Sequence, residues 1–407
     1  MKHTIWHSTL ILITGLVVML GAYADTQTAP PLETINGINL RSMLSEDTRI
    51  EKFRHMDRIF PVQTIQREGS MFAFKESPTD LGAVPYEWEG ETGTLEGFLD
   101  KTTTTNFLVI KDDTIVYERY FRGNTKESLA TSWSVAKSFT SALVGIALEE
   151  DYIESVDDPI TRYLPELEQS GYNGVPIKHI LQMSSGIDFR EVYDDPSSDT
   201  KAMLGRLAMG GSIVDYAASL DSQRKSGEAF NYASIDTNIL GILIEETTGM
   251  SPAKYLEEKI WSELGMESGA TWGTDNHGNT LSFGYLNATA RDYAKFGRLY
   301  LNKGNWNGKQ IVPAAWVEES VNPDQDYLKL VNPEGGLSIG YQYQWWVPAG
   351  TEDEFTGIGV WGQYVYVNPA HNLIIVKNSA DPLFGERTLE TIDVFRAISR
   401  HLADQLE

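Results

Sequence analysis

The sequence predicts an α/β fold in which an antiparallel sheet, built from both ends of the chain, is flanked by helices and interrupted by an inserted helical region. Strand-like segments occur at residues 106–121 and again at 341–378, whereas helical periodicity dominates from 134 to about 322. Strands at both ends with helices between them fit one sheet with helices on its faces. With 407 residues and 41% hydrophobic residues, the chain can bury such a core.

The individual elements follow in order along the chain. Residues 106–110 and 114–121 are rich in β-branched and aromatic residues and flank the polar stretch 111–113, which predicts a hairpin. Later strands are expected at 341–347, 355–367 and 373–378, and a last helix at about 384–406. We expect an N-terminal extension over 25–99 that packs on a main domain over 100–407, whose all-helical insert covers roughly 155–325.

The N-terminus resembles an export signal. Lys2 precedes an apolar run from Thr9 to Ala22, which is too short to span a hydrocarbon core of about 30 Å comfortably. Ala22-Tyr23-Ala24 then fits the A-x-A pattern of a signal peptidase site. We expect cleavage after Ala24, a periplasmic or secreted protein, and no stable membrane anchor. An uncleaved anchor or an internal core helix is the alternative.

Composition excludes several classes of protein. There are 57 Asp and Glu against 33 Lys and Arg, and the formal charge of −24 argues against nucleic acid or an anionic membrane as the main partner. The absence of cysteine excludes disulfides, thiolate nucleophiles and cysteine-ligated metals. No H-E-x-x-H motif or usable phosphate-binding loop occurs, so we expect no metal and no cofactor. Asp194, Asp195 and Asp199 are interpreted as a solvated acidic loop rather than a calcium site.

A serine and a lysine lie three residues apart at the start of a predicted helix. Ser134 and Lys137 precede the apolar run 141–148, which places both on one helical face with Cβ atoms about 5–6 Å apart. The lysine amine could then take the serine proton, and the helix N-terminus would stabilise an alkoxide. A chance match is the alternative, with Ser132 capping the helix and Lys137 solvated.

A second element lies about one hundred residues later. Tyr232-Ala233-Ser234 forms a turn before the apolar helix 235–248. Such a turn could present Tyr232 as a phenolate-type base, with Ser234 as a nearby hydrogen-bond donor. A packed core tyrosine is the alternative.

These elements occur in the order found in one known family. The Ser-x-x-Lys helix, the Tyr-Ala-Ser turn, and segments 179–186 and 290–297 together resemble the serine β-lactamase/penicillin-binding superfamily, in its class C-like branch. Segments 187–199 and 357–363 are most similar to 6-aminohexanoate-dimer hydrolases within that branch. The resemblance extends from about Phe60 to the C-terminus and implies a β-lactamase-like fold.

The resemblance implies a mechanism. Ser134 would attack a carbonyl group to form an acyl-enzyme, while Lys137 and Tyr232 share the proton. The oxyanion would be held by the backbone N–H of Ser134 and by one from the strand that matches the family's Lys-Thr-Gly motif. Aligning that motif with 357–359 makes Val360 the second donor, and a slip of three residues makes it Gln363.

The aligned strand departs from the family pattern and bears on the substrate. Gly357 and Ile358 replace the motif's cation and hydroxyl, which removes a charge-assisted contact to a substrate carboxylate. Small amides or esters therefore fit better than β-lactams. Trp361, Trp345 or Trp346 could supply apolar surface, although the last two could instead alternate across a strand. Tyr193 aligns with a tyrosine that assists the leaving amide nitrogen, with loop packing as the alternative.

The expected function is that of a serine hydrolase for small amide or ester substrates. The alternatives within this fold are a carboxylesterase, a D-amino-acid peptidase and a weak β-lactamase. The alternative outside enzymes is a catalytically retired protein that binds peptidoglycan fragments or a partner. An acidic surface neither requires nor forbids a homodimer.

Overall fold

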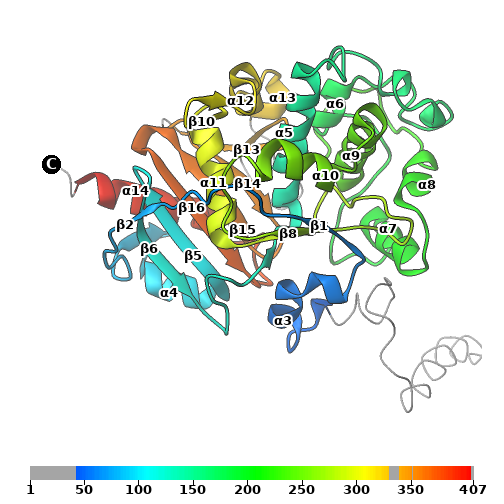
Figure 1. Cartoon of the computed structure of the whole chain (residues 1–407). Coiled ribbons are helices and arrows are strands. Elements are labelled where there is room, and N and C mark those ends of the chain that lie inside the picture. The colour runs from blue at the N-terminus through cyan, green and yellow to red at the C-terminus, as the bar shows by residue number, and fades with distance from the viewer. Residues whose placement is uncertain (1–42, 330–338, 351, 405–407) are drawn as a thin grey trace, which may run out of the picture.

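An eight-stranded sheet forms the centre of the computed structural model, which describes residues 43–329, 339–350 and 352–404 (Figure 1). The strand order is β12-β13-β14-β15-β16-β5-β6-β2. The strands are β2 (Lys75–Glu76), β5 (Thr104–Lys111), β6 (Thr114–Tyr120), β12 (Ile339–Gln342), β13 (Trp345–Pro348), β14 (Phe355–Gly359), β15 (Gln363–Asn368) and β16 (Leu373–Ser379). The neighbours are antiparallel except β2 and β6, which are parallel. Because β16 pairs with β5, the two ends of the chain meet in one sheet, and the predicted fold class is confirmed.

Smaller strands lie outside this sheet. They are β1 (Val62–Ile65), β3 (Pro85–Trp88), β4 (Glu91–Thr94), β7 (Ala130–Thr131), β8 (Ala270–Gly273), β9 (Leu286–Ala288), β10 (Asn305–Trp306) and β11 (Lys309–Gln310). β1, β8, β9 and β7 form a four-stranded sheet, and the others pair as two hairpins. The prediction that the insert is entirely helical therefore needs correction, since β8 to β11 lie within it.

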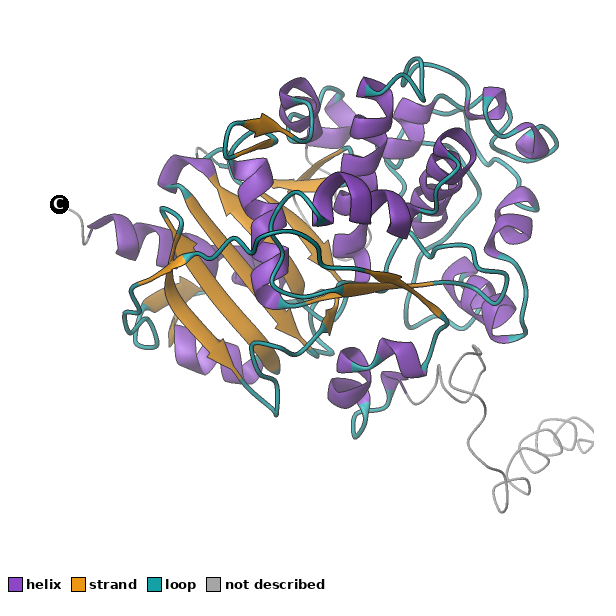
Figure 2. Ribbon diagram, in the orientation of Figure 1, coloured by secondary structure: helices purple, strands orange, loops and turns teal. Residues whose placement is uncertain are grey.

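Helices fill the region beside the sheet and cover its faces (Figure 2). They are α3 (Arg49–Arg54), α4 (Leu95–Lys101), α5 (Ala136–Glu149), α6 (Ile177–Leu181), α7 (Asp199–Ala208), α8 (Ile213–Ala218), α9 (Ser234–Thr248), α10 (Pro252–Leu256), α11 (Ala290–Leu301), α12 (Ala314–Ser320), α13 (Asp326–Lys329) and α14 (Thr388–Asp404). α9 ends where Gly249 adopts φ +71°, a left-handed conformation that costs glycine little. The predicted last helix is confirmed with a later start.

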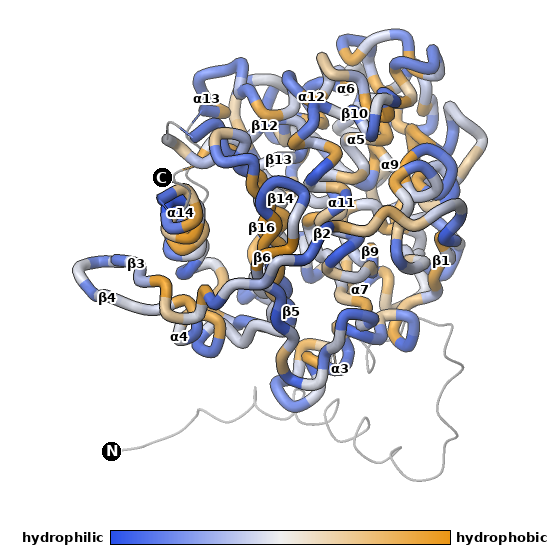
Figure 3. Tube along the Cα trace, turned by 60° about the vertical axis from the view of Figure 1, so that its left-hand side comes forward, coloured by the Kyte–Doolittle hydropathy of each residue, from blue (hydrophilic) through white to orange (hydrophobic). Residues whose placement is uncertain are grey.

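Side-chain alternation divides the core into two layers. On β5, Leu108 and Ile110 belong to the cluster that packs against α5 and α11, whereas Phe107 and Val109 belong to the cluster formed with α4 and α14. This alternation is the period-two pattern of a sheet buried on both faces. Figure 3 shows the apolar turns of α14 beside the apolar strand β16.

Two segments predicted as single strands are hairpins. Residues 341–347 contain a turn at Tyr343 and Gln344, with φ of +36° and +69°, between β12 and β13. Residues 355–367 contain a turn at Trp361 and Gly362, with φ of +66° and +83°, between β14 and β15. Tyr343-Gln344 contains none of the residues that usually mark a turn, whereas the second turn does contain one, Gly362, directly after the aromatic Trp361. The second hairpin places Trp361 at its tip.

The predicted signal segment 1–24 lies outside the described residues. Within the described part of the chain, none of the helices combines the length and apolarity that crossing a bilayer requires.

Candidate active site

Ser134 lies in a 3₁₀ turn, Trp133–Val135, that leads directly into α5. Trp133 has φ +44°, a strained conformation for a bulky residue. The rings of Phe53 and Tyr285 hold it in place, with centroids 5.3 and 5.4 Å from the tryptophan ring. Because this turn continues directly into α5, Ser134 lies at the start of the helix, as predicted. Its side chain is half-buried.

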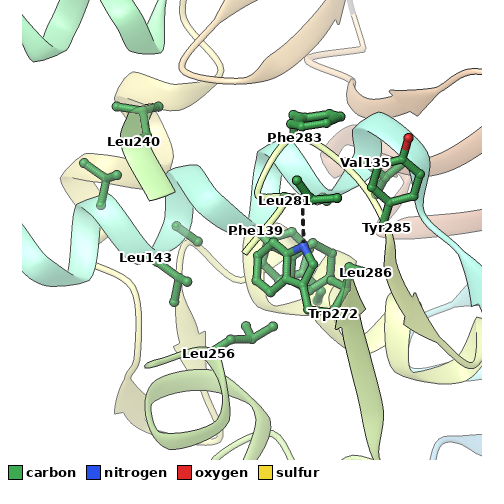
Figure 4. Packing of buried hydrophobic residues seen from close by; sticks show 14 of the residues in the cluster. Val135, Phe139, Leu143, Leu240, Leu256, Trp272, Leu281, Phe283, Tyr285 and Leu286 are labelled. Carbon is green, nitrogen blue, oxygen red and sulfur yellow. Dashed lines mark hydrogen bonds between the residues drawn. The ribbon is translucent and has the colours of Figure 1, made fainter. Parts of the chain in front are cut away.

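A buried apolar face fixes α5 against the segment 281–286. Phe139 of α5 lies beside Leu281 and Trp272, and the indole N–H of Trp272 donates to the Leu281 carbonyl at 3.2 Å (Figure 4). This packing brings the Phe283 carbonyl to the first turn of α5, where it faces Lys137.

Lys137 is buried and surrounded by oxygen atoms. Its Nζ lies 3.0 Å from Ser134 Oγ, 2.9 Å from Ser234 Oγ and 2.9 Å from the Phe283 carbonyl oxygen. The alternative of a solvated surface lysine is wrong, because the side chain is only 1% exposed. Burial lowers the pKa of Lys137 to about 8, and the negative charge of Glu191 opposes that shift. A sizeable fraction of this amine is therefore neutral near pH 8 and can accept a proton.

Tyr232 reaches the same serine from the segment that precedes α9. Its phenol interacts with the Ser134 hydroxyl, and its ring stacks on Trp346 with centroids 5.6 Å apart. Burial among these rings raises the pKa of Tyr232, Glu191 raises it further, and the interaction with Ser134 lowers it slightly. A raised pKa favours the protonated phenol at rest, and the role of Tyr232 as a phenolate-type base stays a prediction. Tyr232 is suited to relaying a proton.

Glu191 is a member of the site to which the sequence interpretation assigned no role. Its carboxylate accepts hydrogen bonds from the Ser234 N–H at 2.6 Å, from the Ser234 hydroxyl at 2.8 Å and from the Tyr193 phenol. Ser234 therefore donates to Glu191 while it accepts from Lys137. The only feature of the sequence that could have pointed to Glu191 as a site residue is its spacing of two residues from Tyr193 inside the segment 187–199.

Ser134 opens onto an apolar cavity of about 110 Å³. The lining includes Val360 and Trp361 from the β14–β15 turn, Tyr193, and Phe384. Trp361 thus lies where predicted. Trp345 and Trp346 are not in the lining and alternate across β13, Trp345 toward Phe296 and Trp346 toward Tyr232.

The β14–β15 turn also distinguishes the two candidate oxyanion donors. Val360 lines the cavity with Ser134, and its N–H makes no hydrogen bond to another described residue. Gln363 lies away from this cavity, where its side chain donates to the Ser379 carbonyl. A Cβ at Gly359 would lie 2.5 Å from the Ser132 carbonyl oxygen, so glycine permits the close approach of β14 to the serine turn. The geometry favours Val360.

Tyr193 lines the cavity near its mouth. The side chain is 42% exposed, and its ring lies 6.5 Å from that of Phe384. Its phenol is held by Glu191 rather than by loop packing alone.

The acidic loop carries ordinary loop contacts. Asp195 accepts from Arg190 at 2.6 Å and from the Ser197 hydroxyl at 2.8 Å. Within the described ranges, no group of three metal-ligating side chains is arranged to hold an ion.

Comparison with known proteins places this geometry in context. The Beta-lactamase family model matches residues 93–392. The chain is 31% identical to the 6-aminohexanoate-dimer hydrolase of Paenarthrobacter ureafaciens over 301 residues, which covers 71% of this chain and 75% of that protein. Among solved structures, “Putative 6-aminohexanoate-dimer hydrolase from Bacillus anthracis” aligns with a TM-score of 0.82 and 26% identity, covering 93% of this chain and 99% of the other. A family VIII carboxylesterase shares the fold with a TM-score of 0.56 and 16% identity, covering 74% and 95% of the two chains.

Proposed function

Because the chain belongs to the Beta-lactamase family of hydrolases, we propose that it is a serine hydrolase that cleaves small amide or ester bonds through an acyl-enzyme on Ser134. The observation that carries the proposal is the buried amine of Lys137, 3.0 Å from Ser134 Oγ at the edge of a cavity. A lysine whose pKa is lowered by burial can act as a base at mildly alkaline pH, which activates an otherwise weak nucleophile.

The first half of the reaction forms the acyl-enzyme. Neutral Lys137 takes the proton of Ser134 as Oγ bonds to the substrate carbonyl carbon. The resulting oxyanion accepts hydrogen bonds from the N–H groups of Ser134 and Val360. When the tetrahedral intermediate collapses, its bond to the leaving group breaks. The proton passes from Lys137 through the Tyr232 phenol to the leaving nitrogen or oxygen.

The second half releases the acid product. Water enters in place of the leaving group and gives a proton to the same pair as its oxygen bonds to the acyl carbon. Collapse of the second intermediate breaks the bond to Ser134 Oγ, which regains its proton. The reaction as written requires no group beyond the protein and water.

We propose a preference for amides over β-lactams. An amide nitrogen must be protonated as it leaves, and Tyr232 is the proposed donor, since the Tyr193 phenol at the cavity donates its hydrogen bond to Glu191. The similarity to an enzyme named for an amide dimer supports the same preference. Gly357 and Ile358 offer no charge for a substrate carboxylate, which argues against rapid β-lactam turnover. We propose further that the enzyme acts outside the cytoplasm, which rests on residues 1–24 alone.

A substrate panel tests this function. The purified mature protein is incubated with p-nitrophenyl esters, a linear 6-aminohexanoate dimer and nitrocefin, beside a Ser134→Ala variant. Ser141→Ala is the matched control, since Ser141 lies on the same helix and its buried hydroxyl has no hydrogen-bond partner among the described residues. We expect ester or amide hydrolysis that Ser134→Ala abolishes and Ser141→Ala retains. Failure to turn over any ester or amide, or hydrolysis unaffected by Ser134→Ala, would overturn the proposal.

A further inference from the structure

The cavity beside Ser134 is closed partly by residues far upstream of the catalytic elements. Met43 and Leu44 line it together with Met203 and Leu204 of α7. Neither Met43 nor Leu44 falls within residues 93–392, the range matched by the family model. In Figures 1 and 3, α3, which begins five residues after Leu44, lies at the same end of the molecule as α7. The N-terminal segment 43–54 is therefore part of the site.

Segment 43–54 is anchored to the turn that carries the proposed oxyanion donor. The Arg49 guanidinium lies 4.1 Å from the centre of the Trp361 ring and donates to the Ala380 carbonyl at 3.2 Å. Phe53 contacts the same tryptophan edge-on at 6.1 Å. Arg54 donates to the Asn124 side chain at 2.7 Å. These contacts hold the segment in a defined place against the cavity.

The chemistry of the lining indicates an apolar ligand. The Glu191 carboxylate already accepts three hydrogen bonds from Ser234 and Tyr193, so it is not free to pair with a substrate cation. Away from this cluster the lining is mainly apolar, and its polar members are the nucleophile Ser134, Tyr285, and Thr200 and Lys201 of α7. An apolar wall rewards the burial of methylene groups.

The position of the cavity relative to Ser134 indicates which part of the substrate enters it. Tyr232, the proposed proton source for the leaving group, is absent from the lining, whereas Val360 is present. The leaving group must face its proton donor, so the cavity receives the other side of the carbonyl, the acyl group.

We propose that segment 43–54 forms a wall of the acyl pocket and that Met43 and Leu44 set the length of the apolar acyl chain that this enzyme accepts. This inference rests on the proposed function and adds the substrate class to it. An apolar cavity of about 150 Å³ holds benzene, so the cavity of about 110 Å³ here suits a linear chain of about four carbons.

The test is a series of p-nitrophenyl esters from acetate to octanoate, measured as kcat/KM. Wild-type protein should favour butyrate. Met43→Ala should move the optimum to longer chains, with a gain of about fourfold for each additional buried methylene. Leu44→Trp should fill part of the cavity and move the optimum toward acetate. Leu44 is half-buried and therefore tolerates a larger side chain better than the buried Met43 does. Met209→Ala is the matched control, since Met209 follows α7, is 82% exposed and does not line the cavity.

A second series distinguishes the acyl side from the leaving-group side. Acetate esters of alcohols of increasing length should show the same length dependence in wild-type protein and in both variants. Thermal unfolding of each variant confirms that the protein assayed is folded. The inference is overturned if folded Met43→Ala and Leu44→Trp keep the wild-type acyl optimum, or if their effect appears only in the alcohol series. Either outcome leaves the proposed function standing as long as Ser134→Ala still abolishes hydrolysis.

Discussion

In the part of the chain that the structure describes, two buried lysines are hydrogen-bonded to serine side chains, and the two lysines differ in what surrounds them. Ser134 and Lys137 lie 3.0 Å apart at the start of α5, and Ser379 and Lys377 lie 2.9 Å apart at the end of β16. Burial lowers the pKa of Lys137 to about 8 and that of Lys377 to about 7. By distance and by lysine pKa alone, the second pair would be as good a nucleophile and base as the first.

Access and hydrogen bonding separate the two pairs. Ser379 Oγ lies 2.6 Å from the Trp361 carbonyl oxygen and 2.9 Å from that of Gly362, so its proton is engaged by the β14–β15 turn. It borders a cavity of only about 10 Å³, which is room for about one water. Ser134 instead faces the larger cavity and the phenol of Tyr232. We infer that Ser379 and Lys377 support the turn, whereas Ser134 and Lys137 carry out the chemistry.

Replacing the two serines should give the largest contrast. Ser134→Ala removes the proposed nucleophile and should lower kcat by about 10⁴-fold or more. Ser379→Ala removes a support of the turn and should cost about tenfold or less, since misplacing one donor weakens rather than abolishes catalysis. Ester hydrolysis by both variants checks this. Equal losses in the two variants would contradict the assignment.

Replacing the two lysines should give a smaller contrast. Lys137→Met removes the proposed base and should reduce kcat by about 10³-fold. Lys377→Met places an unbranched apolar side chain among the rings of Phe98 and Tyr364 and should keep activity within about tenfold, with little loss of stability. Kinetics and thermal unfolding are measured together. A Lys137→Met variant at the wild-type rate would remove the lysine from the mechanism.

Removing the phenol of Tyr232 should have an intermediate effect. Tyr232→Phe keeps the ring that stacks on Trp346 but loses the proton relay, and kcat should fall by about 10²-fold. Tyr341→Phe is the control, because Tyr341 packs against Tyr232 and its buried hydroxyl has no hydrogen-bond partner among the described residues. The loss should be greater for amides than for esters, because an amide nitrogen needs the proton more. A fall that Tyr341→Phe reproduces would assign the effect to packing.

The smallest expected effect is a shift in the pH dependence of kcat/KM. This pH dependence should follow the titration of Lys137 and not that of Lys377. A lysine base works when neutral, so the rate should rise with pH and level off above a midpoint near the Lys137 pKa of about 8. The charge of Glu191 raises that pKa, so Glu191→Gln should move the midpoint to lower pH. Lys377→Met should leave the midpoint in place. A midpoint that follows Lys377 instead would reverse the comparison.

Local sequence patterns predicted the Ser134–Lys137 pair but not the Ser379–Lys377 pair. Ser134 and Lys137 lie on one helical turn, and a spacing of three in a recognisable helix is enough to bring them together. Lys377 and Ser379 share one face of a strand, but their burial depends on β16 being central in the sheet, which only the tertiary structure reveals. A lysine in a predicted strand is normally expected to face solvent.

Glu191 escaped prediction for a related reason. Its bonds to Ser234 join a loop to a helix 43 residues later, and nothing in either segment specifies the other. Tyr232 could be assigned to the same site as Ser134 because the resemblance to the serine β-lactamase/penicillin-binding superfamily implies that the two residues act together. The hairpin turn at 343–344 was missed because Tyr343-Gln344 contains no Gly, Pro, Asn, Asp or Ser, and the turn at 361–362 was missed although Gly362 is a typical turn residue.

Covalent labelling tests the assignment of Ser134 most directly. The mature protein is treated with a fluorophosphonate, digested, and the modified peptide is located by mass spectrometry, with Ser134→Ala and Ser379→Ala treated in parallel. We predict a single adduct on Ser134, retained in Ser379→Ala and absent from Ser134→Ala. An adduct on Ser379 or on any other residue, with Ser134 unmodified while esters are hydrolysed, would contradict the account.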